Sequence, residues 1–271
     1  MDLKGKTALV PGAVKGIGKG IAVALARAGA NVVANWFDWE ESLPSLEADL
    51  SATGGRYQIR QTDLTDTAAV TRLVQEAAAH FGGLDILVNN IERGGWPVVH
   101  GPYRQSQWDM EQATTLRAKQ WLFEGALPHL KASGDGVVIN ISSIAGIVGR
   151  CGPSSFVFND GYAAANRGIS LLTETWARLG APEVRVNEIM LGLVETRHGP
   201  ATRGWGLLTA QQQEALLAHT LLGRTGRVSE VVDAVMFLVC GARFMTGATL
   251  RLDGGYLLGG EGVAPMPEGV E

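Results

Sequence analysis

The sequence predicts an α/β fold in which one parallel β-sheet is covered by helices on both faces. Short apolar runs alternate along the chain with longer segments of helical periodicity, as is typical of right-handed βαβ units. Several of the strand-like runs, residues 7–10 and 136–141 among them, are mainly apolar, as expected of strands that are covered on both sides. With 271 residues, 46% of them hydrophobic, the chain is long enough to bury one large core.

Each strand is predicted from an apolar run, and each helix from the amphipathic segment that follows. The expected strands are residues 7–10, 31–34, 56–60, 84–88, 136–141, 184–189 and 249–252. The expected helices are residues 17–27, 40–50, 67–80, 108–130, 161–179, 209–222 and 229–239. Residues 1–258 are predicted to form a single domain, and residues 259–271, rich in Gly and Pro, a C-terminal tail.

Composition and charge narrow the expected partners and compartment. The net charge of −4 argues against nucleic acid as a partner, and no apolar run is long enough to predict a membrane span. The N-terminus lacks the pattern of a signal peptide. Cys151 and Cys240 have no metal-ligand spacing, so neither a disulfide framework nor a metal site is predicted, and a cytoplasmic location is favoured.

A glycine-rich turn follows the first strand and opens the first helix. It contains Gly12, Lys15, Gly16, Ile17 and Gly18 in a G-x-x-x-G-x-G spacing. Glycines allow a close backbone approach to a pyrophosphate, and the helix N-terminus supplies N–H groups and positive partial charge. A tight turn without a ligand is the alternative.

Polar residues also stand at the ends of the third and fourth predicted strands, at the same edge of the sheet. Asp63 and Leu64 follow the third strand, where the carboxylate would accept from an adenine amino group, and Asn89 and Asn90 close the fourth. Taken singly, these residues are turn formers or helix caps. At successive strand ends they favour a cofactor groove. Residues 91–104 and 145–160, two long connections at the same edge, are candidates to line it.

With these motifs the chain resembles the short-chain dehydrogenase/reductase family over most of its length. The matching positions are Gly12, Gly16, Ile17, Gly18, Asp63, Asn89, Asn90, Ser142, Ser143, Tyr162, Arg185, Val186, Asn187, Thr196, Asp253, Gly254 and Gly255. The resemblance implies a single-domain, Rossmann-like, doubly wound sheet and an NAD(P)(H) cofactor. It also implies hydride transfer between a small-molecule carbonyl compound and its alcohol, and a homo-oligomer, either a dimer or a tetramer.

Several positions depart from the family pattern. Pro11 precedes the glycine turn, Ile91 and Glu92 follow the two asparagines, and Leu191 replaces the proline before Gly192. Thr115 stands at the expected position of the family's helix asparagine, and Asn166 at that of its lysine, four residues after Tyr162.

The departures at Thr115 and Asn166 resemble the ketoreductase domains of modular polyketide synthases and animal fatty-acid synthases. In those domains the lysine sits on the preceding helix and asparagine takes its former place. Lys119 lies four residues after Thr115, which would put both on one helical face. The alternatives are a solvated lysine at 119 and an unrelated substitution at 166.

The resemblance assigns the catalytic roles. Tyr162 would donate the proton, and Ser143 would hydrogen-bond the carbonyl oxygen as negative charge develops there. Lys119 would supply the positive charge that stabilises a phenolate and would anchor the cofactor ribose. Asn166 would hold Tyr162, a water or the lysine in line, and Thr196 would bind the nicotinamide carboxamide.

Two residues bear on the choice of cofactor. Lys15 could contact a 2′-phosphate, whereas Asp38 could reach a ribose hydroxyl. We expect NADP(H) rather than NAD(H). Candidate contacts to an acidic or aromatic substrate are Arg93, His198, Arg203 and Trp205.

The sequence thus predicts an NADP(H)-dependent oxidoreductase that reduces a ketone, with β-keto acyl and related carbonyl compounds as expected substrates. The alternative is a catalytically silent, nucleotide-binding subunit that stabilises an active partner. Pro11, Glu92 and Leu191 motivate that alternative because each alters a cofactor-facing motif.

Overall fold

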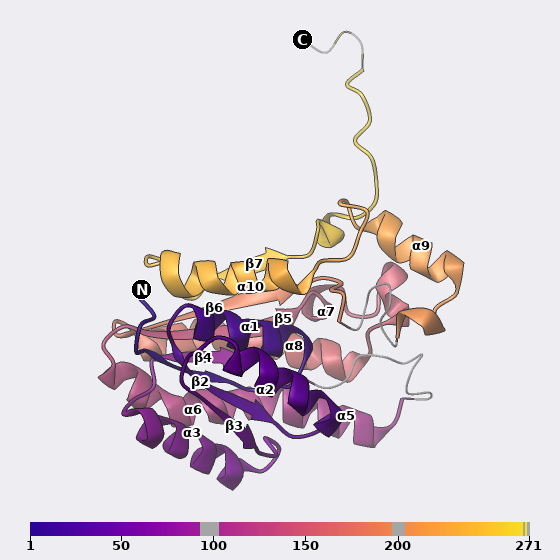
Figure 1. The fold of residues 1–271 in the computed structure, drawn as a ribbon. Helices are drawn as coiled ribbons and strands as arrows, with labels where there is room; N and C mark the ends of the chain where they lie inside the picture. The colour runs from indigo at the N-terminus through magenta and orange to yellow at the C-terminus, as the bar shows by residue number, and fades with distance from the viewer. Residues whose placement is uncertain (93–102, 197–203, 268, 270–271) are drawn as a thin grey trace.

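The computed structural model describes residues 1–92, 103–196, 204–267 and 269, and it contains one seven-stranded parallel sheet (Figure 1). The strand order is β3-β2-β1-β4-β5-β6-β7. The strands are β1 (Thr7–Val10), β2 (Asn31–Trp36), β3 (Tyr57–Gln61), β4 (Ile86–Asn89), β5 (Gly136–Ser143), β6 (Val184–Leu191) and β7 (Thr249–Leu252). This is the doubly wound Rossmann arrangement, so the predicted fold class is confirmed.

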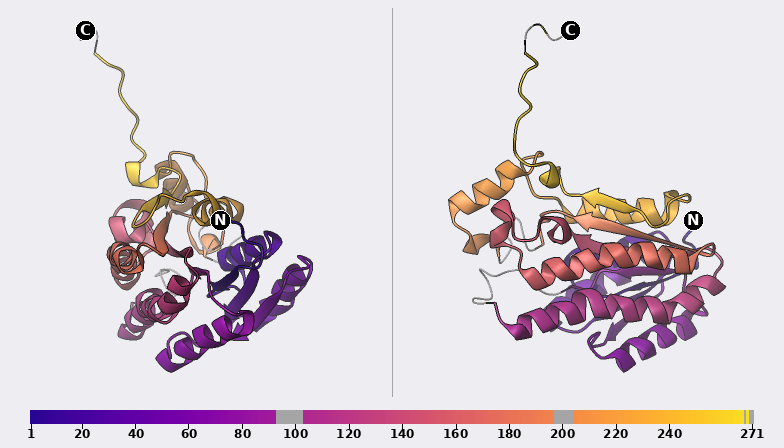
Figure 2. Two further views of the ribbon diagram at one scale, coloured as in Figure 1. Left: turned by 90° about the vertical axis from the view of Figure 1, so that its left-hand side faces the viewer. Right: turned by 180° about the vertical axis from the view of Figure 1, so that it is seen from behind.

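Helices cover both faces of the sheet (Figure 2). On one face, α1 (Gly16–Arg27), α2 (Leu43–Ser51) and α10 (Val228–Met236) share a hydrophobic core with the strands. On the other face, α3 (Thr67–Phe81), α6 (Ala118–Ala132) and α8 (Asp160–Gly180) build a second core. In that core the Phe123 and Trp176 rings stack at 4.6 Å, which joins α6 to α8.

A third apolar cluster lies beyond the C-terminal ends of β5 and β6. It packs the short helices α7 (Ala145–Val148) and η3 (Gly152–Phe156) with η4 (Trp205–Leu207) and α9 (Ala210–His219). The long connection at residues 145–160 therefore contains two short helices, α7 and η3, that the sequence pattern did not predict. With four and five residues, α7 and η3 are too short to leave a periodic pattern in the sequence.

The expected helix at residues 108–130 consists of three consecutive segments. They are α5 (Gln105–Glu111), the π-helical segment η2 (Gln112–Arg117) and α6. A second π segment, η5 (Phe237–Gly241), continues α10. The remaining described elements are the one-turn helices η1 (Glu40–Ser42) and η6 (Tyr256–Leu258).

The strand order reverses direction between β1 and β4. The chain moves outward from β1 to β2 and β3, then returns to place β4 on the other side of β1. At such a switch point the connections leave toward opposite faces, and a crevice opens at the carboxyl ends of the strands. The glycine turn after β1 and the two asparagines at the end of β4 lie at this point.

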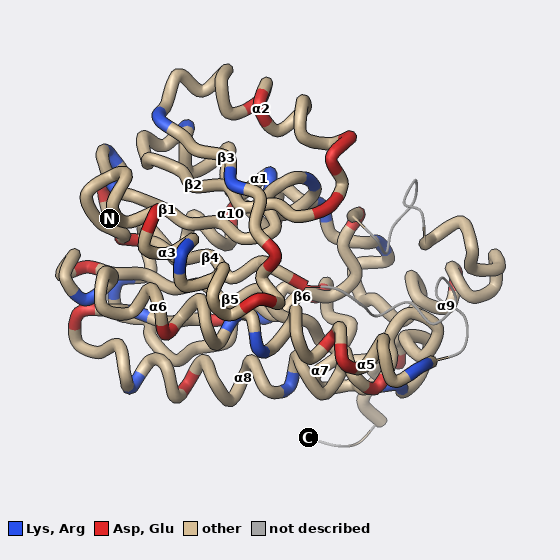
Figure 3. Tube along the Cα trace, turned by 90° about the horizontal axis from the view of Figure 1, so that it is seen from below, with Lys and Arg blue, Asp and Glu red and all other residues tan. Residues whose placement is uncertain are grey.

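The two termini differ in their packing. The Met1 ammonium donates to the Cys240 carbonyl at 2.7 Å, which ties the N-terminus to η5. Residues 261–267 are exposed, carry no regular structure and run away from the body of the molecule (Figure 1). Basic and acidic residues are interspersed over the helices (Figure 3). Across the described residues, no helix is both long and apolar enough to cross a membrane.

Candidate active site

The glycine turn is built for close backbone approach. Gly12 and Gly16 have φ of +67° and +57°, in the left-handed region that favours glycine. A Cβ at Gly18 would lie 2.2 Å from the Gly12 carbonyl oxygen, so no other residue fits there without a shift. Helix α1 begins after Lys15 without a side-chain cap on its first N–H groups. These features fit the pyrophosphate of a dinucleotide.

Three strand ends converge on this turn. The Asn90 side chain at the end of β4 donates to the Gly12 carbonyl at 3.1 Å. Asn35 of β2 accepts from the Gly12 amide at 3.4 Å. The Thr196 methyl group, beyond β6, would lie 3.3 Å from a Cβ at Gly16. The structure thus brings together residues that lie far apart in the sequence.

Four further residues predicted to contact the nucleotide differ in their burial and in their contacts. Lys15 Nζ lies 2.9 Å above the centre of the Trp39 ring, a cation–π contact beside the turn. Asp38 is half-buried after β2, and Leu64 is buried. Asp63 Oδ1 accepts from the Thr65 amide at 2.9 Å and from its hydroxyl at 2.7 Å. Asp63 therefore forms a local turn, one of the roles that the sequence left open.

Tyr162 lies in the first turn of α8 and is almost fully buried. Asn159 caps this helix by accepting from the Tyr162 amide at 2.9 Å. The phenol donates to Glu92 Oε2 at 2.9 Å, so the carboxylate after β4 meets the hydroxyl of α8. Ser143, at the end of β5, is buried, and its hydroxyl accepts from the Ala145 amide at 3.1 Å.

Asn166 faces the sheet one turn after Tyr162. Its side-chain nitrogen donates to the Tyr162 carbonyl at 3.0 Å. Its Oδ1 atom is buried and has no hydrogen-bond partner in the described part of the chain. Because a buried amide oxygen normally accepts a hydrogen bond, this atom marks a place where a donor would be stabilised.

Lys119 is fully buried in the first turn of α6, so it is not the solvated lysine of the alternative interpretation. Its ammonium donates to the Ile141 carbonyl at 2.6 Å. Burial lowers the pKa of Lys119 to about 8, while the negative charges of Glu92 and Glu188 oppose that shift. Both carboxylates thus favour the charged form of this lysine.

The relatives of this chain agree with its fold and motifs. Residues 12–257 match the family described as Enoyl-(Acyl carrier protein) reductase. The chain is 30% identical to a 3-oxoacyl-[acyl-carrier-protein] reductase, FabG, of Thermotoga maritima, over 95% of this chain and 100% of that protein. It is 35% identical to cis-4-hydroxycyclohexanecarboxylate dehydrogenase of Sinomonas cyclohexanicum, over 93% and 96% of the two chains.

A solved structure from Sinorhizobium meliloti 1021, provisionally described as a short-chain alcohol dehydrogenase, superposes with a TM-score of 0.82. The two chains are 29% identical, over 95% of this chain and 98% of that one. The chain belongs to the short-chain dehydrogenase/reductase family. It is an oxidoreductase of a family that uses nicotinamide cofactors, and the glycine turn fits that cofactor class.

In this short-chain dehydrogenase/reductase, Glu188 is a site residue that the sequence did not reveal. It is fully buried in β6 and accepts hydrogen bonds from Ser142, from Ser170 at 2.8 Å and from Thr249 at 2.6 Å. A carboxylate within an inner strand of a predicted parallel sheet was the signal that could have found it, because acidic residues are rarely fully buried unless paired.

Glu111 is a second buried carboxylate that the sequence did not single out. It accepts from Asn159 Nδ2 at 2.5 Å and from the Tyr103 hydroxyl at 2.9 Å. Burial and this carboxylate raise the pKa of Tyr103. A Cβ at Gly161 would lie 2.5 Å from a Glu111 oxygen, so the glycine makes room for the cluster. Glu111 thereby braces Asn159, which caps the helix that carries Tyr162.

The π segment η2 ends two residues before Lys119 in the chain. Thr115 within η2 and Lys119 just after it are both fully buried. The sequence placed them on one face through ordinary α-helical spacing, whereas the chain reaches Lys119 through a wider turn. The two positions still face the interior together.

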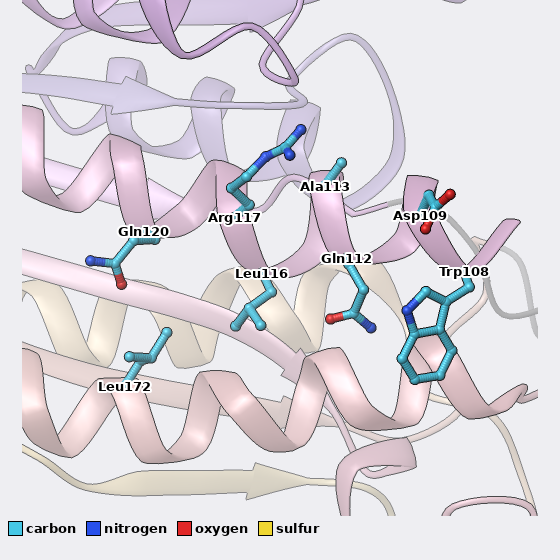
Figure 4. Close-up of a pocket in the computed structure, with 8 residues that line it drawn as sticks. All are labelled: Trp108, Asp109, Gln112, Ala113, Leu116, Arg117, Gln120 and Leu172. Carbon is cyan, nitrogen blue, oxygen red and sulfur yellow. The ribbon is translucent and has the colours of Figure 1, made fainter. Parts of the chain in front are cut away.

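A surface pocket lies apart from these residues, between α5–η2–α6 and α8 (Figure 4). Its volume is about 490 Å³. Leu116 and Leu172 approach each other across it, with Trp108 at one end and Gln120 at the other. None of the catalytic candidates lines it. Arg93, His198 and Arg203 lie outside the described residues, and Trp205 is buried in the third cluster.

The buried ammonium should make stability depend on pH. The unfolded chain holds the Lys119 proton up to a pKa of about 10.4, but the folded chain only up to about 8. Between these values the unfolded state binds more protons, so the free energy of unfolding should rise with pH. The Lys119→Met variant has no ammonium at this position, so this contribution to the pH dependence of its free energy of unfolding is absent. The free energy of unfolding, measured in urea, should rise from pH 8 to 10.5 by roughly 3 kcal/mol more in the native protein than in the variant. A flat difference would contradict the burial of the charge.

Proposed function

We propose that this short-chain dehydrogenase/reductase reduces a ketone to a secondary alcohol with NADP(H). The observation that carries the proposal is the buried Lys119 ammonium on the helix before β5, combined with Asn166 one turn beyond Tyr162. The Lys119 ammonium interacts electrostatically with Glu92, whose carboxylate accepts from the Tyr162 phenol, while the family's usual lysine position holds an amide. This supports a relocated lysine rather than a lost one.

The proposed catalytic residues act on two oxygen atoms, the carbonyl oxygen of the substrate and the phenol oxygen of Tyr162. When bound, the nicotinamide supplies the hydride that the carbonyl carbon accepts. Tyr162 gives its hydroxyl proton to the carbonyl oxygen, and Ser143 donates a hydrogen bond to the same oxygen. Lys119 would offset the negative charge left on the phenol and would hold the cofactor ribose. The unpaired Oδ1 of Asn166 can accept from a water or from the lysine head, which would keep the proton path in line.

The cofactor would lie along the crevice at the switch point. The residues proposed to hold it are Gly12, Lys15, Gly16, Ile17, Gly18, Asp38, Asp63, Leu64, Asn89, Asn90 and Thr196. Asn89 Oδ1 is buried and has no partner among the described residues, so it can accept from a group that enters here. The exposed Lys15 ammonium beside Trp39 favours a 2′-phosphate and therefore NADP(H) over NAD(H).

Substrate class and assembly follow from the relatives and the surface. The FabG relatives act on 3-oxoacyl groups and the Sinomonas relative on a cyclic alcohol, which supports a small carbonyl or alcohol substrate, β-keto acyl compounds included. Residues 1–258 would form the catalytic domain and 259–271 a tail. Leu171 and Leu179 are exposed on α8, and pairing of α6 and α8 between copies would cover them in a homo-oligomer.

Tyr162→Phe should abolish reduction while leaving the cofactor bound. Loss of the proton donor should lower kcat/KM by about a hundredfold or more. The Kd for NADPH, measured by fluorescence titration, should not change. Tyr57→Phe, at the far edge of the sheet, is the control and should retain activity. Full turnover by Tyr162→Phe would sink the assignment. NADPH binding without turnover of any ketone by the native protein would instead favour the silent nucleotide-binding subunit.

Lys15→Ala should weaken NADPH binding selectively. Removing one charge-assisted hydrogen bond to a 2′-phosphate should raise the Kd for NADPH about tenfold and leave that for NADH unchanged. Lys19→Ala is the matched control, because Lys19 lies four residues further along, within α1, and pairs with Asp49 at 2.6 Å. Equal weakening of both cofactors would refute the assignment of NADP(H).

A further inference from the structure

Trp39, in the connection after β2, has a backbone conformation that disfavours a large side chain. Its φ of +69° and ψ of +46° lie in the left-handed region, and it is the one non-glycine residue in the described part of the chain with a positive φ. The Cβ of an L-residue crowds the following carbonyl oxygen in this region, and glycine avoids that crowding. Such strain beside a ligand site points to a function for the side chain.

The connection that carries Trp39 is fixed at both ends. At the end of β2, the Asn35 carbonyl accepts from the Ala13 amide at 2.8 Å, and the Asn35 side chain accepts from the Gly12 amide, both in the glycine turn. Beyond β2, the Trp39 carbonyl accepts from the Ser42 amide at 2.9 Å as η1 begins. The backbone therefore holds the indole beside the turn that would receive the cofactor phosphates.

The indole presents its face to the Lys15 ammonium. Lys15 Nζ lies 2.9 Å above the ring centre, and both side chains are exposed. The ring attracts a cation through its quadrupole but carries no net charge, so it adds nothing that would repel a phosphate. Lys19, one turn further along α1, is instead paired with the Asp49 carboxylate at 2.6 Å. The ring is not the sole contact of Lys15, but it attracts the ammonium without neutralising it.

We propose that Trp39 is a positioning residue for cofactor selection, whose ring face holds the Lys15 ammonium ready for the 2′-phosphate of NADPH. This rests on the proposed NADP(H) dependence. A lysine side chain is flexible and loses rotamer freedom when it binds a ligand, whereas a side chain that is already ordered avoids that cost. The ammonium has three N–H donors, so a contact with the ring still allows it to donate to phosphate oxygens. Because NADH has a hydroxyl in place of the phosphate, the benefit falls on NADPH.

The test measures the Kd of NADPH and of NADH by isothermal titration calorimetry and compares the ratio of the NADH value to the NADPH value. Trp39→Gly removes the ring and accepts the left-handed backbone, so the variant should keep the native circular dichroism spectrum. We expect the ratio to fall about two- to fivefold, as the loss of an exposed cation–π contact implies. Trp39→Phe, which keeps an aromatic face, should retain most of the native ratio. In a Lys15→Ala background, Trp39→Gly should cause no further fall, because both changes remove the same interaction.

Trp108→Ala is the matched control, because Trp108 is 39% exposed against 40% for Trp39 and lies on α5 at the surface pocket. It should leave the ratio at its native value. An unchanged ratio in Trp39→Gly, with a lowered one in Lys15→Ala, would overturn the role of Trp39 and leave the NADP(H) assignment standing. A further fall on adding Trp39→Gly to Lys15→Ala would also overturn that role. An unchanged ratio in Lys15→Ala would refute the NADP(H) assignment, and the inference with it.

Discussion

The Lys119 ammonium is fully buried, and the residues around it are arranged to make that burial tolerable. An isolated charge inside a protein is costly unless hydrogen bonds and opposite charges surround it. Here the Ile141 carbonyl accepts directly, while Glu92 and Glu188 provide negative charge. Glu188 in turn binds side chains from β5, α8 and β7. The charge on α6 is thereby linked, through Glu188 of β6, to β5, α8 and β7.

Helix α8 is the other half of this arrangement. Tyr162, Asn166, Ser170 and Thr173 lie along the face that meets the sheet, spaced as one side of a helix requires. Ser170 reaches Glu188, and Thr173 accepts from Asn140, which itself accepts from Asn89 of β4. Polar contacts from this face of α8 thus reach β6 through Ser170 and the end of β4 through Thr173 and Asn140. Apolar packing alone would hold α8 against the sheet, whereas these directional hydrogen bonds also fix its position along the strands, and with it the position of Tyr162.

The features that follow from local pattern were predictable from the sequence. Short strand-like runs that alternate with helix-period segments predicted all seven strands, and the Gly12–Gly18 turn marked the crevice because its glycines are needed for backbone approach. Features that depend on contacts between distant residues were not predictable. The sequence marked Glu92 only as a departure from a motif, since its partner Tyr162 lies 70 residues away. The short helices α7 and η3 and the π segment before Lys119 form through packing rather than periodicity.

The central claim is that Lys119 supplies the charge that the family's usual lysine position no longer holds. The most direct test measures kcat/KM for ketone reduction in Lys119→Ala and in the double variant Lys119→Ala/Asn166→Lys. The account predicts a loss of about a hundredfold or more in the single variant, and recovery of much of it when the ammonium returns beside Tyr162. Near-native activity of Lys119→Ala would contradict the account.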